Sequence, residues 1–258
     1  MCLINFHFQD HPKYKLVVVA NRDESYARPT ASADFWEDNQ NILAGRDLLQ
    51  GGTWLGVTKT GRFAALTNYR DPSLPTSGRV SRGAIVRQYL SADVEPLEFI
   101  RKLAEDRSLY DGFNIIVGGG DQLVHYNNIL DETNVITPGT HSLSNHTLNT
   151  PWPKVVKGRQ QLKDYMQANQ NTLEFRSLFE IISDRTIAED KDLPHTGVGL
   201  ELERALSSLF IKTPNYGTRS STVLLIDKKD EITFIERAFI EGELYEEKRF
   251  TFKSRIED

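Results

Sequence analysis

The residues best suited to chemistry lie in the first 24 positions of the sequence. The only cysteine, Cys2, directly follows Met1, and its small side chain allows an aminopeptidase to remove that methionine. Cys2 would then carry both a thiol, with a pKa near ~8.5, and a free α-amine, with a pKa near ~7.7–8.0. A terminal amine can act as the base for its own nucleophile. We therefore predict a nucleophilic Cys2; the alternative is a small buried apolar side chain, the usual role of a lone cysteine.

A polar cluster, Asn21-Arg22-Asp23-Glu24, follows the apolar strand predicted for residues 15–21. The two-residue period of a strand places Asn21 and Asp23 on one face and Arg22 on the other. If the first face points at Cys2, Asp23 can orient the terminal ammonium, and Arg22 would pair with an acid such as Glu24. Asn21 and Arg22 are also candidate substrate-binding residues.

Other polar residues occur where predicted strands begin or end. Asn68 and Asn145 are candidate donors to an oxyanion, a contact that is worth several kcal/mol in catalysis; the alternative is a turn-forming asparagine. Arg219 follows a glycine turn and could hold a carboxylate or an oxyanion, or it could be a surface arginine. Candidate residues for the wall of a binding cleft are Arg28, Trp36, Arg46, Trp54, Tyr69 and Trp152.

Composition excludes several classes of function. A net charge of −5 and a pI near 5.7 argue against nucleic acid as a partner. One cysteine excludes an intramolecular disulfide framework and suits a reducing compartment. The longest apolar run, residues 16–20, is too short to span a bilayer, and no signal or transit peptide is visible. We expect a soluble, cytoplasmic protein.

No cofactor or metal site is expected. The six histidines are scattered without carboxylates at metal-binding spacing. The glycine triplet at residues 118–120 lacks the lysine and the helix of a phosphate-binding loop, so it is interpreted as a turn.

Apolar patterns predict strands at both ends and in the middle of the chain, separated by pairs of helices. Strands are expected at residues 2–8, 15–21, 54–58, 62–68, 113–117, 123–126, 222–226, 232–239 and 244–252. Helices are expected after caps at Ser81 and Asp93, and at residues 154–168, 173–183 and 200–210. Residues 26–50 are expected to be irregular. This order predicts an α+β fold, with two antiparallel sheets between helical layers, and a single domain over residues 1–258.

Motifs spread along the whole chain resemble those of the NRDE family, whose eukaryotic members form the transport and Golgi organisation 2 group. They are Met1-Cys2, Ala20-Asn21-Arg22-Asp23-Glu24, Gly51-Gly52-Thr53-Trp54-Leu55-Gly56, Leu66-Thr67-Asn68-Tyr69, Gly112-Phe113-Asn114, Leu143-Ser144-Asn145, Thr150-Pro151-Trp152 and Tyr216-Gly217-Thr218-Arg219.

The layout is also similar, more distantly, to cysteine N-terminal-nucleophile amidohydrolases such as penicillin V acylase and bile salt hydrolase. This resemblance implies a four-layer αββα sandwich and hydrolysis of a non-peptide amide. It implies Cys2 as nucleophile and Asp23 as support of its amine. It also implies Asn68 and Asn145 as oxyanion donors and Arg219 as a further site residue. The arginine that those hydrolases place three residues before the aspartate falls on Ala20, while this chain has Arg22.

Two functions follow from these resemblances. The first is an amidohydrolase that acts on a small-molecule amide through Cys2. The second, implied by the eukaryotic relatives, is a non-catalytic carrier or trafficking factor for haem or another hydrophobic, lipid-like ligand in the same cleft. A structural or regulatory role on an inherited fold is a third option. The sequence leaves the oligomeric state open.

Overall fold

Two antiparallel sheets form the centre of the molecule. The computed structural model describes residues 2–74 and 80–254. The first sheet has six strands in the order β10-β1-β2-β11-β12-β13. Their bounds are β1 (Cys2–Phe8), β2 (Tyr14–Ser25), β10 (Gly139–Leu143), β11 (Tyr216–Asp227), β12 (Glu231–Ile240) and β13 (Glu243–Lys253).

The second sheet has seven strands, which pair in the order in which they occur in the chain. Their bounds are β3 (Thr30–Phe35), β4 (Ile42–Asp47), β5 (Leu55–Thr58), β6 (Phe63–Asn68), β7 (Phe113–Gly118), β8 (Leu123–Asn127) and β9 (Glu132–Val135).

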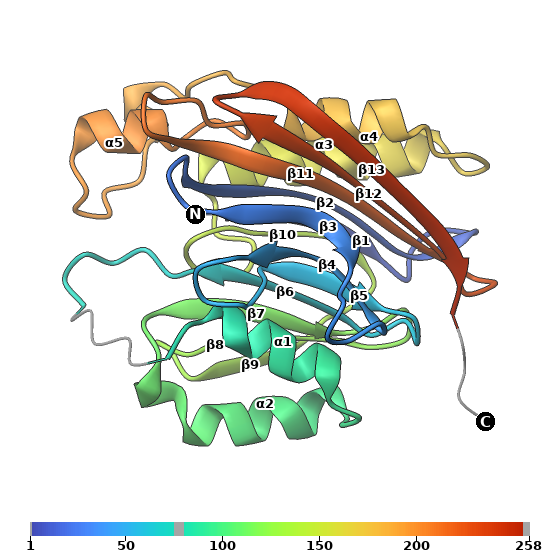
Figure 1. The fold of residues 1–258 in the computed structure, drawn as a ribbon. Coiled ribbons are helices and arrows are strands. Elements are labelled where there is room, and N and C mark those ends of the chain that lie inside the picture. Colours follow the sequence, from blue (N-terminus) through green and yellow to red (C-terminus); the bar gives the residue numbers. More distant parts are fainter. Residues whose placement is uncertain (1, 75–79, 255–258) are drawn as a thin grey trace.

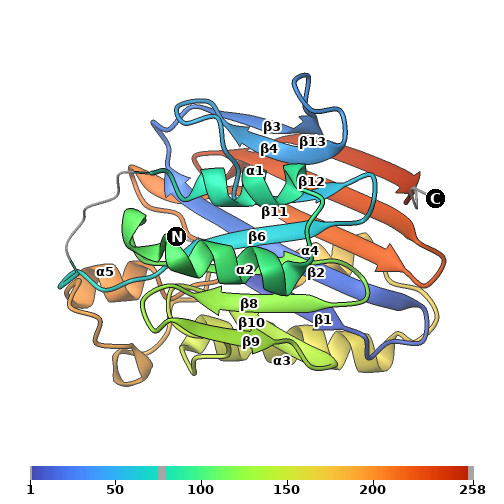
Figure 2. The same cartoon turned by 90° about the horizontal axis from the view of Figure 1, so that it is seen from below.

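Helices cover the outer face of each sheet (Figures 1 and 2). On the six-stranded sheet lie α3 (Pro153–Ala168) and α4 (Phe175–Ile182), with α5 (Leu200–Ala205) at the end where β1 begins. On the seven-stranded sheet lie α1 (Gly83–Ser91) and α2 (Pro96–Glu105). Short 3₁₀ turns occupy Arg107–Leu109 and Asp190–Asp192. None of the helices within the described residues is long and apolar enough to cross a membrane.

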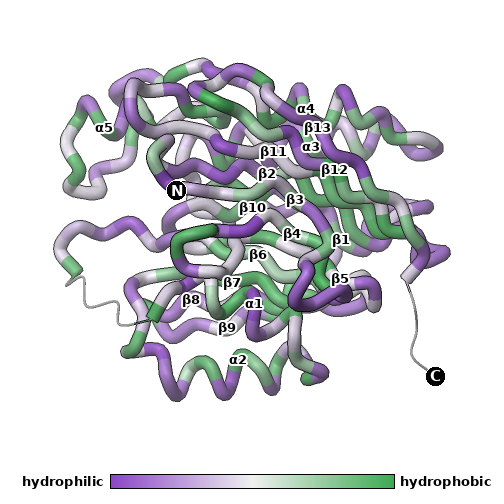
Figure 3. The backbone as a smooth tube through the Cα atoms, viewed as in Figure 1, coloured by the Kyte–Doolittle hydropathy of each residue, from purple (hydrophilic) through white to green (hydrophobic). Residues whose placement is uncertain are grey.

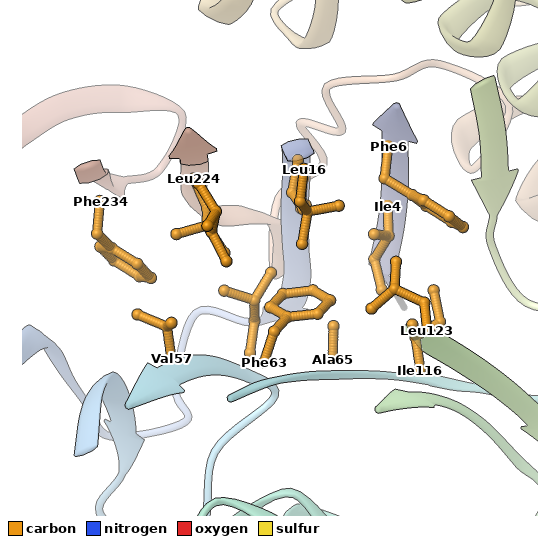
Figure 4. Close-up of a cluster of buried hydrophobic side chains, with 14 of the residues drawn as sticks. Ile4, Phe6, Leu16, Val57, Phe63, Ala65, Ile116, Leu123, Leu224 and Phe234 are labelled. Carbon is orange, nitrogen blue, oxygen red and sulfur yellow. The ribbon is translucent and has the colours of Figure 1, made fainter. Parts of the chain in front are cut away.

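Within the described residues, three large apolar clusters and a smaller one, made of Leu3, Trp152, Val155 and Leu209, fill the spaces between these four layers. The first lies between the sheets, where Leu16 and Leu224 face Phe63 and Ala65 (Figure 4). The second joins the seven-stranded sheet to α1 and α2, and the third joins the six-stranded sheet to α3 and α4. Figure 3 shows the corresponding concentration of hydrophobic residues in the strands. The predicted αββα sandwich of antiparallel sheets is confirmed.

The apolar run in β2 explains why this strand is central. Val18 and Ala20 point into the cluster between the sheets, whereas Val17 and Val19 point into the cluster below α3 and α4. Successive side chains of a strand point to opposite faces, so a strand without alternation is buried on both. Each fully buried aliphatic side chain contributes about 1.5–3 kcal/mol.

Several predicted elements differ from those observed. Residues 26–50, expected to be irregular, contain β3 and β4, and β9 was not expected. Neither Ser81 nor Asp93 caps a helix: Arg82 and Glu95 occupy the N-cap positions of α1 and α2, without side-chain capping bonds. Pro96 is itself the first residue of α2, a position that tolerates the missing N–H of proline.

Candidate active site

A cavity of about 330 Å³ lies where β1 begins and where β2 and β6 end. Figure 1 marks this end of β1 with N, at the same end of the six-stranded sheet as α5. The lining includes Cys2 and Asn68, together with the loop before β5 and the start of α1. Its charged residues are Arg22, Asp23, Glu24, Arg28, Asp47, Arg82 and Asp111.

Cys2 and Arg22 are cross-strand partners in the pairing of β1 with β2, so their side chains share a face. The Cys2 carbonyl accepts a hydrogen bond from the Ser144 hydroxyl at 3.0 Å. Burial raises the pKa of the Cys2 thiol, while the Arg22 charge and the backbone N–H of Asp23 act in the opposite direction. The thiol is therefore mostly protonated at neutral pH and needs a base.

Arg22 is 5% exposed and faces the second sheet. Its guanidinium carbon lies 4.2 Å from the centre of the Trp54 ring, and Nη1 donates to the Thr30 hydroxyl at 3.0 Å. The predicted pair with Glu24 is not found among the described residues, since one Glu24 carboxylate oxygen accepts from the backbone N–H of Ser25. Trp54 and Arg22 thus form one wall of the cavity.

Asp23 lies on the other face of β2, as the two-residue period predicts. Its Oδ1 accepts a hydrogen bond from the Thr218 hydroxyl at 2.7 Å, and its side chain is buried. Burial raises the pKa of Asp23, and the nearby charge of Lys154 opposes this rise. The Cys2 side chain therefore shares a face with Arg22 and not with Asp23, although both Cys2 and Asp23 line the cavity.

A buried lysine that the sequence did not single out accompanies Asp23. Lys154, in the first turn of α3, is 2% exposed, and its Nζ makes no hydrogen bond within the described part of the chain. Burial lowers its pKa to about 8, while Asp23 acts to raise it. In the sequence, Lys154 is an ordinary polar position of an amphipathic helix. Only the depth to which α3 packs on β1 reveals its burial.

Asn68 and Asn145 are adjacent but have different surroundings. Asn68 ends β6 and lines the cavity. Asn145 is fully buried; its Nδ2 donates to the Asn68 carbonyl at 3.0 Å, and its Oδ1 accepts from the Ser144 hydroxyl. The side chain of Asn145 therefore holds the end of β6 in place, and Asn68 is the asparagine that lines the cavity.

Arg219 is not among the residues that line the Cys2 cavity. Its Nη1 donates to the backbone carbonyls of Ser25, Tyr26 and Arg28, at 2.8–3.1 Å. The pairing of β11 with β2 shifts register between Thr218 and Ser220, and Arg219 lines a second cavity of about 140 Å³ with Glu236. Arg219 fixes the turn that carries Arg28.

Of the other residues predicted to bind substrate, some line the cavity and others do not. Arg28 lines the cavity, and its Nε and Nη2 both donate to Asp47, at 2.8 and 2.5 Å. The Asn21 side chain is committed to the carbonyls of Ile182 and Leu209 and to the Ser221 hydroxyl. Tyr69 stacks on His146, and Trp36, Arg46 and Trp152 also lie outside the lining.

The start of α1 forms a wall that the sequence did not predict. Ser81, Arg82 and Gly83 line the cavity, and Arg82 Nη1 donates to the Gly112 carbonyl at 3.0 Å. A Cβ on Gly52 would lie 2.5 Å from the backbone carbon of Gly83, so glycine is required for this close approach. The Gly-Gly pair before a predicted strand was the available signal.

Metal coordination has no candidate among the described residues, which contain no group of three or more His, Cys, Asp or Glu side chains able to hold an ion.

Comparison with solved structures identifies the same architecture at low sequence identity. A C2A mutant of the conjugated bile acid hydrolase from Clostridium perfringens has a TM-score of 0.51 at 8% identity, covering 97% of both chains. The Caenorhabditis elegans ortholog of N-acylethanolamine-hydrolyzing acid amidase has a TM-score of 0.50 at 13% identity, covering 87% of this chain and 92% of that one. These likenesses show the fold.

Comparison of sequences gives closer relatives. The human Transport and Golgi organization protein 2 homolog is 36% identical over 267 residues, covering 95% of each chain. Transport and Golgi organization protein 2 of Drosophila melanogaster is 29% identical over 263 residues, covering 92% of this chain and 91% of the fly protein. The family model described as Transport and Golgi organisation 2 matches residues 1–241. The chain therefore belongs to the Transport and Golgi organisation 2 family.

Proposed function

We propose that this protein hydrolyses a non-peptide amide of a small molecule, with Cys2 as nucleophile after removal of Met1. The observation that carries the proposal is the position of Cys2 in a polar cavity at the end of the inter-sheet space, with Arg22 and Asn68 also in the lining. The two proteins of similar fold, named as an amidase and a bile acid hydrolase, support the reaction class by analogy.

In the first half of the reaction, the α-amine of Cys2 takes the thiol proton and the sulfur attacks the amide carbonyl. The amide group of Asn68 donates to the oxyanion of the tetrahedral intermediate. The C–N bond then breaks, the leaving amine takes the proton from the α-ammonium, and an acyl-Cys2 thioester remains. Asp23 lies on the face of β2 opposite to the Cys2 side chain but lines the same cavity, and its charge stabilises the ammonium form.

In the second half, the α-amine takes a proton from water and the hydroxide attacks the thioester. The C–S bond breaks, the thiolate recovers the proton, and the acid leaves. Each half-reaction returns the amine to its starting protonation state, because the amine accepts a proton as a general base and then donates it as a general acid. A thiol nucleophile suits the cytoplasm, the compartment expected from the sequence, because thiols stay reduced there.

The carrier function is less well supported by the cavity. A haem or lipid site is expected to be lined mainly by apolar and aromatic groups, whereas charged and polar residues together predominate here. Of the four aromatic residues considered for the cleft wall, Trp54 alone is in the lining; Trp36 and Trp152 are 4% and 8% exposed, in apolar clusters.

The test is mass spectrometry of protein produced with active methionine aminopeptidase. After incubation with a library of small acyl amides, the intact mass should show an acyl adduct on Cys2, and Cys2→Ala should show none. Protein that retains Met1 is the matched control, because it keeps the thiol but lacks the α-amine, and it should acylate far more slowly. Absence of both adduct and turnover in protein with confirmed Met1 removal would contradict the proposal.

A further inference from the structure

Two arginines in the lining of the Cys2 cavity, Arg22 and Arg82, have no carboxylate of a described residue at ion-pairing distance. Arg28, the third arginine of the lining, differs because its fork is occupied by Asp47. An arginine fork is the side chain best matched to a carboxylate, which it can bind through two parallel hydrogen bonds.

Both guanidinium groups are held in place without being saturated. In the described part of the chain, the Arg22 guanidinium makes one hydrogen bond, to Thr30, and is stacked on Trp54. The Arg82 guanidinium also makes one there, to the Gly112 carbonyl. A guanidinium carries five N–H donors, so each retains donors for a ligand. Both are partly removed from water, which makes an unpaired positive charge costly and an anionic ligand favourable.

The acids of the lining do not neutralise these two groups by contact. Asp47 is paired with Arg28, and Asp23 lies on the opposite face of β2. The charges of Glu24 and Asp111 oppose the lowering of the Arg82 pKa by burial, but within the described residues neither carboxylate lies at ion-pairing distance from Arg82. The first turn of α1, which begins beside Arg82, contains no acidic side chain and no side-chain cap, so the positive end of the helix adds to the same field.

We propose that the Cys2 cavity selects amides that bear a carboxylate, with Arg22 and Arg82 binding that carboxylate while the amide carbonyl faces Cys2. The substrate class would then be short half-amides of dicarboxylic acids or similar anionic acyl amides. This inference rests on the proposed function for the reaction, but the anion preference can be measured without turnover.

The direct test compares iodoacetate with iodoacetamide, two alkylating agents of nearly equal size that differ in charge. With either reagent, the thiol of Cys2 gives its proton to a base or to water, the sulfur forms a bond to the methylene carbon, the C–I bond breaks, and iodide leaves with the electron pair. Because Cys2 is the only cysteine, the labelling rate reports this one site. The ratio of the iodoacetate rate to the iodoacetamide rate should be about tenfold higher in folded than in urea-unfolded protein.

Arg82→Gln and Arg22→Gln should each lower this ratio severalfold, through the iodoacetate rate. Arg82→Lys should recover part of it, because the charge returns without the fork. Arg87→Gln is the matched control: it removes the same charge from an exposed position of α1 and should leave the ratio unchanged. A folded-state ratio equal to that of the unfolded chain, or equal losses in Arg82→Gln and Arg87→Gln, would overturn the inference.

A second measurement separates this inference from the proposed function. Protein lacking Met1 is incubated with glutaramate, a five-carbon half-amide, and with the neutral pentanamide. Faster acylation of Cys2 by glutaramate supports the inference, whereas equal acylation overturns it and leaves the hydrolase proposal standing. If neither amide acylates Cys2, this substrate assignment is overturned. A raised iodoacetate ratio would then still support an anion site, and the wider amide library decides the hydrolase proposal.

Discussion

Burial of single ionisable side chains sets the chemistry available near Cys2. The thiol pKa of Cys2 is raised by burial, so a thiolate at neutral pH requires a base within reach. The nearby lysine, Lys154, is shifted in the opposite direction, to a pKa of about 8. A group with such a pKa can gain or lose a proton at physiological pH, which an ordinary surface lysine cannot.

Glu236 allows a quantitative test of how burial changes the pKa of a single side chain. It lines the second cavity, is 3% exposed, and accepts a hydrogen bond from the Ala33 N–H at 2.6 Å. Burial raises its pKa from 4.5 to about 7. The folded state therefore binds this proton more tightly than the unfolded state, and the resulting stability, roughly 3 kcal/mol, is present below pH 4.5 and lost as pH rises through 7.

Glu236→Gln keeps the acceptor for Ala33 but cannot ionise. We expect it to be more stable than the parent protein by up to about 3 kcal/mol at pH 8, and by less than about 1 kcal/mol at pH 5. Urea denaturation at the two pH values measures this. Glu231→Gln, at an exposed position of the same strand, should change neither value by more than about 0.5 kcal/mol. A Glu236→Gln effect independent of pH would contradict the assignment of a raised pKa.

At the scale of elements, a buried ion pair joins the end of β6 to α5. Arg70 Nη1 lies 2.9 Å from a Glu203 carboxylate oxygen, and the two side chains are 7% and 4% exposed. The backbone N–H of Arg70 also donates to the Asn145 carbonyl at 2.7 Å. Removing one partner of a buried pair leaves an uncompensated charge, which costs about 3–5 kcal/mol.

Glu203→Gln should therefore lower the free energy of unfolding by about 3 kcal/mol or more, measured by urea denaturation at pH 7. Glu201→Gln is the matched control on the same helix, because its ion pair with Arg204 is exposed; it should cost less than about 1 kcal/mol. Similar losses in the two variants would mean that α5 is not held by the Arg70–Glu203 pair.

Elements differ in how far the sequence could predict them. The apolar runs of β1 and β6 locate those strands to within a residue, since every position in them packs on a neighbouring layer. β3, with the sequence TASADF, is missed because its small and polar residues carry no apolar pattern; pairing with β4 holds it in the sheet.

The residues of the candidate site could also be predicted only in part from the sequence. Cys2, Asp23 and Asn68 could be chosen from residue type and position at strand ends, and all three line the cavity. Arg219 lies outside the Cys2 cavity because the pairing of β11 shifts register beside it. Arg82 lines the cavity because Gly52 allows the start of α1 to pack close to the loop before β5. Both depend on contacts between residues far apart in the chain, which local sequence patterns do not record.

On the scale of the whole molecule, the central strand pairs join distant parts of the sequence. Val19 of β2 pairs with Val223 of β11, and Ile4 of β1 pairs with Leu143 of β10. Folding is slow when most contacts are non-local, because the entropy cost of closing long loops precedes the favourable free energy of the contacts. We expect refolding from urea, followed by tryptophan fluorescence in a stopped-flow instrument, to take on the order of seconds. Completion within a millisecond would contradict this expectation.

The same topology dictates an order of events during synthesis. β1 is translated before its neighbour β10, which follows only after more than a hundred further residues; their synthesis takes roughly ten seconds or more on a ribosome. During that interval β1 can pair with β2 but lacks its other neighbour, β10, so the start of the chain is expected to be accessible to an aminopeptidase. If Cys2 acts as proposed, removal of Met1 is expected in this interval, before β10 completes the sheet beside β1.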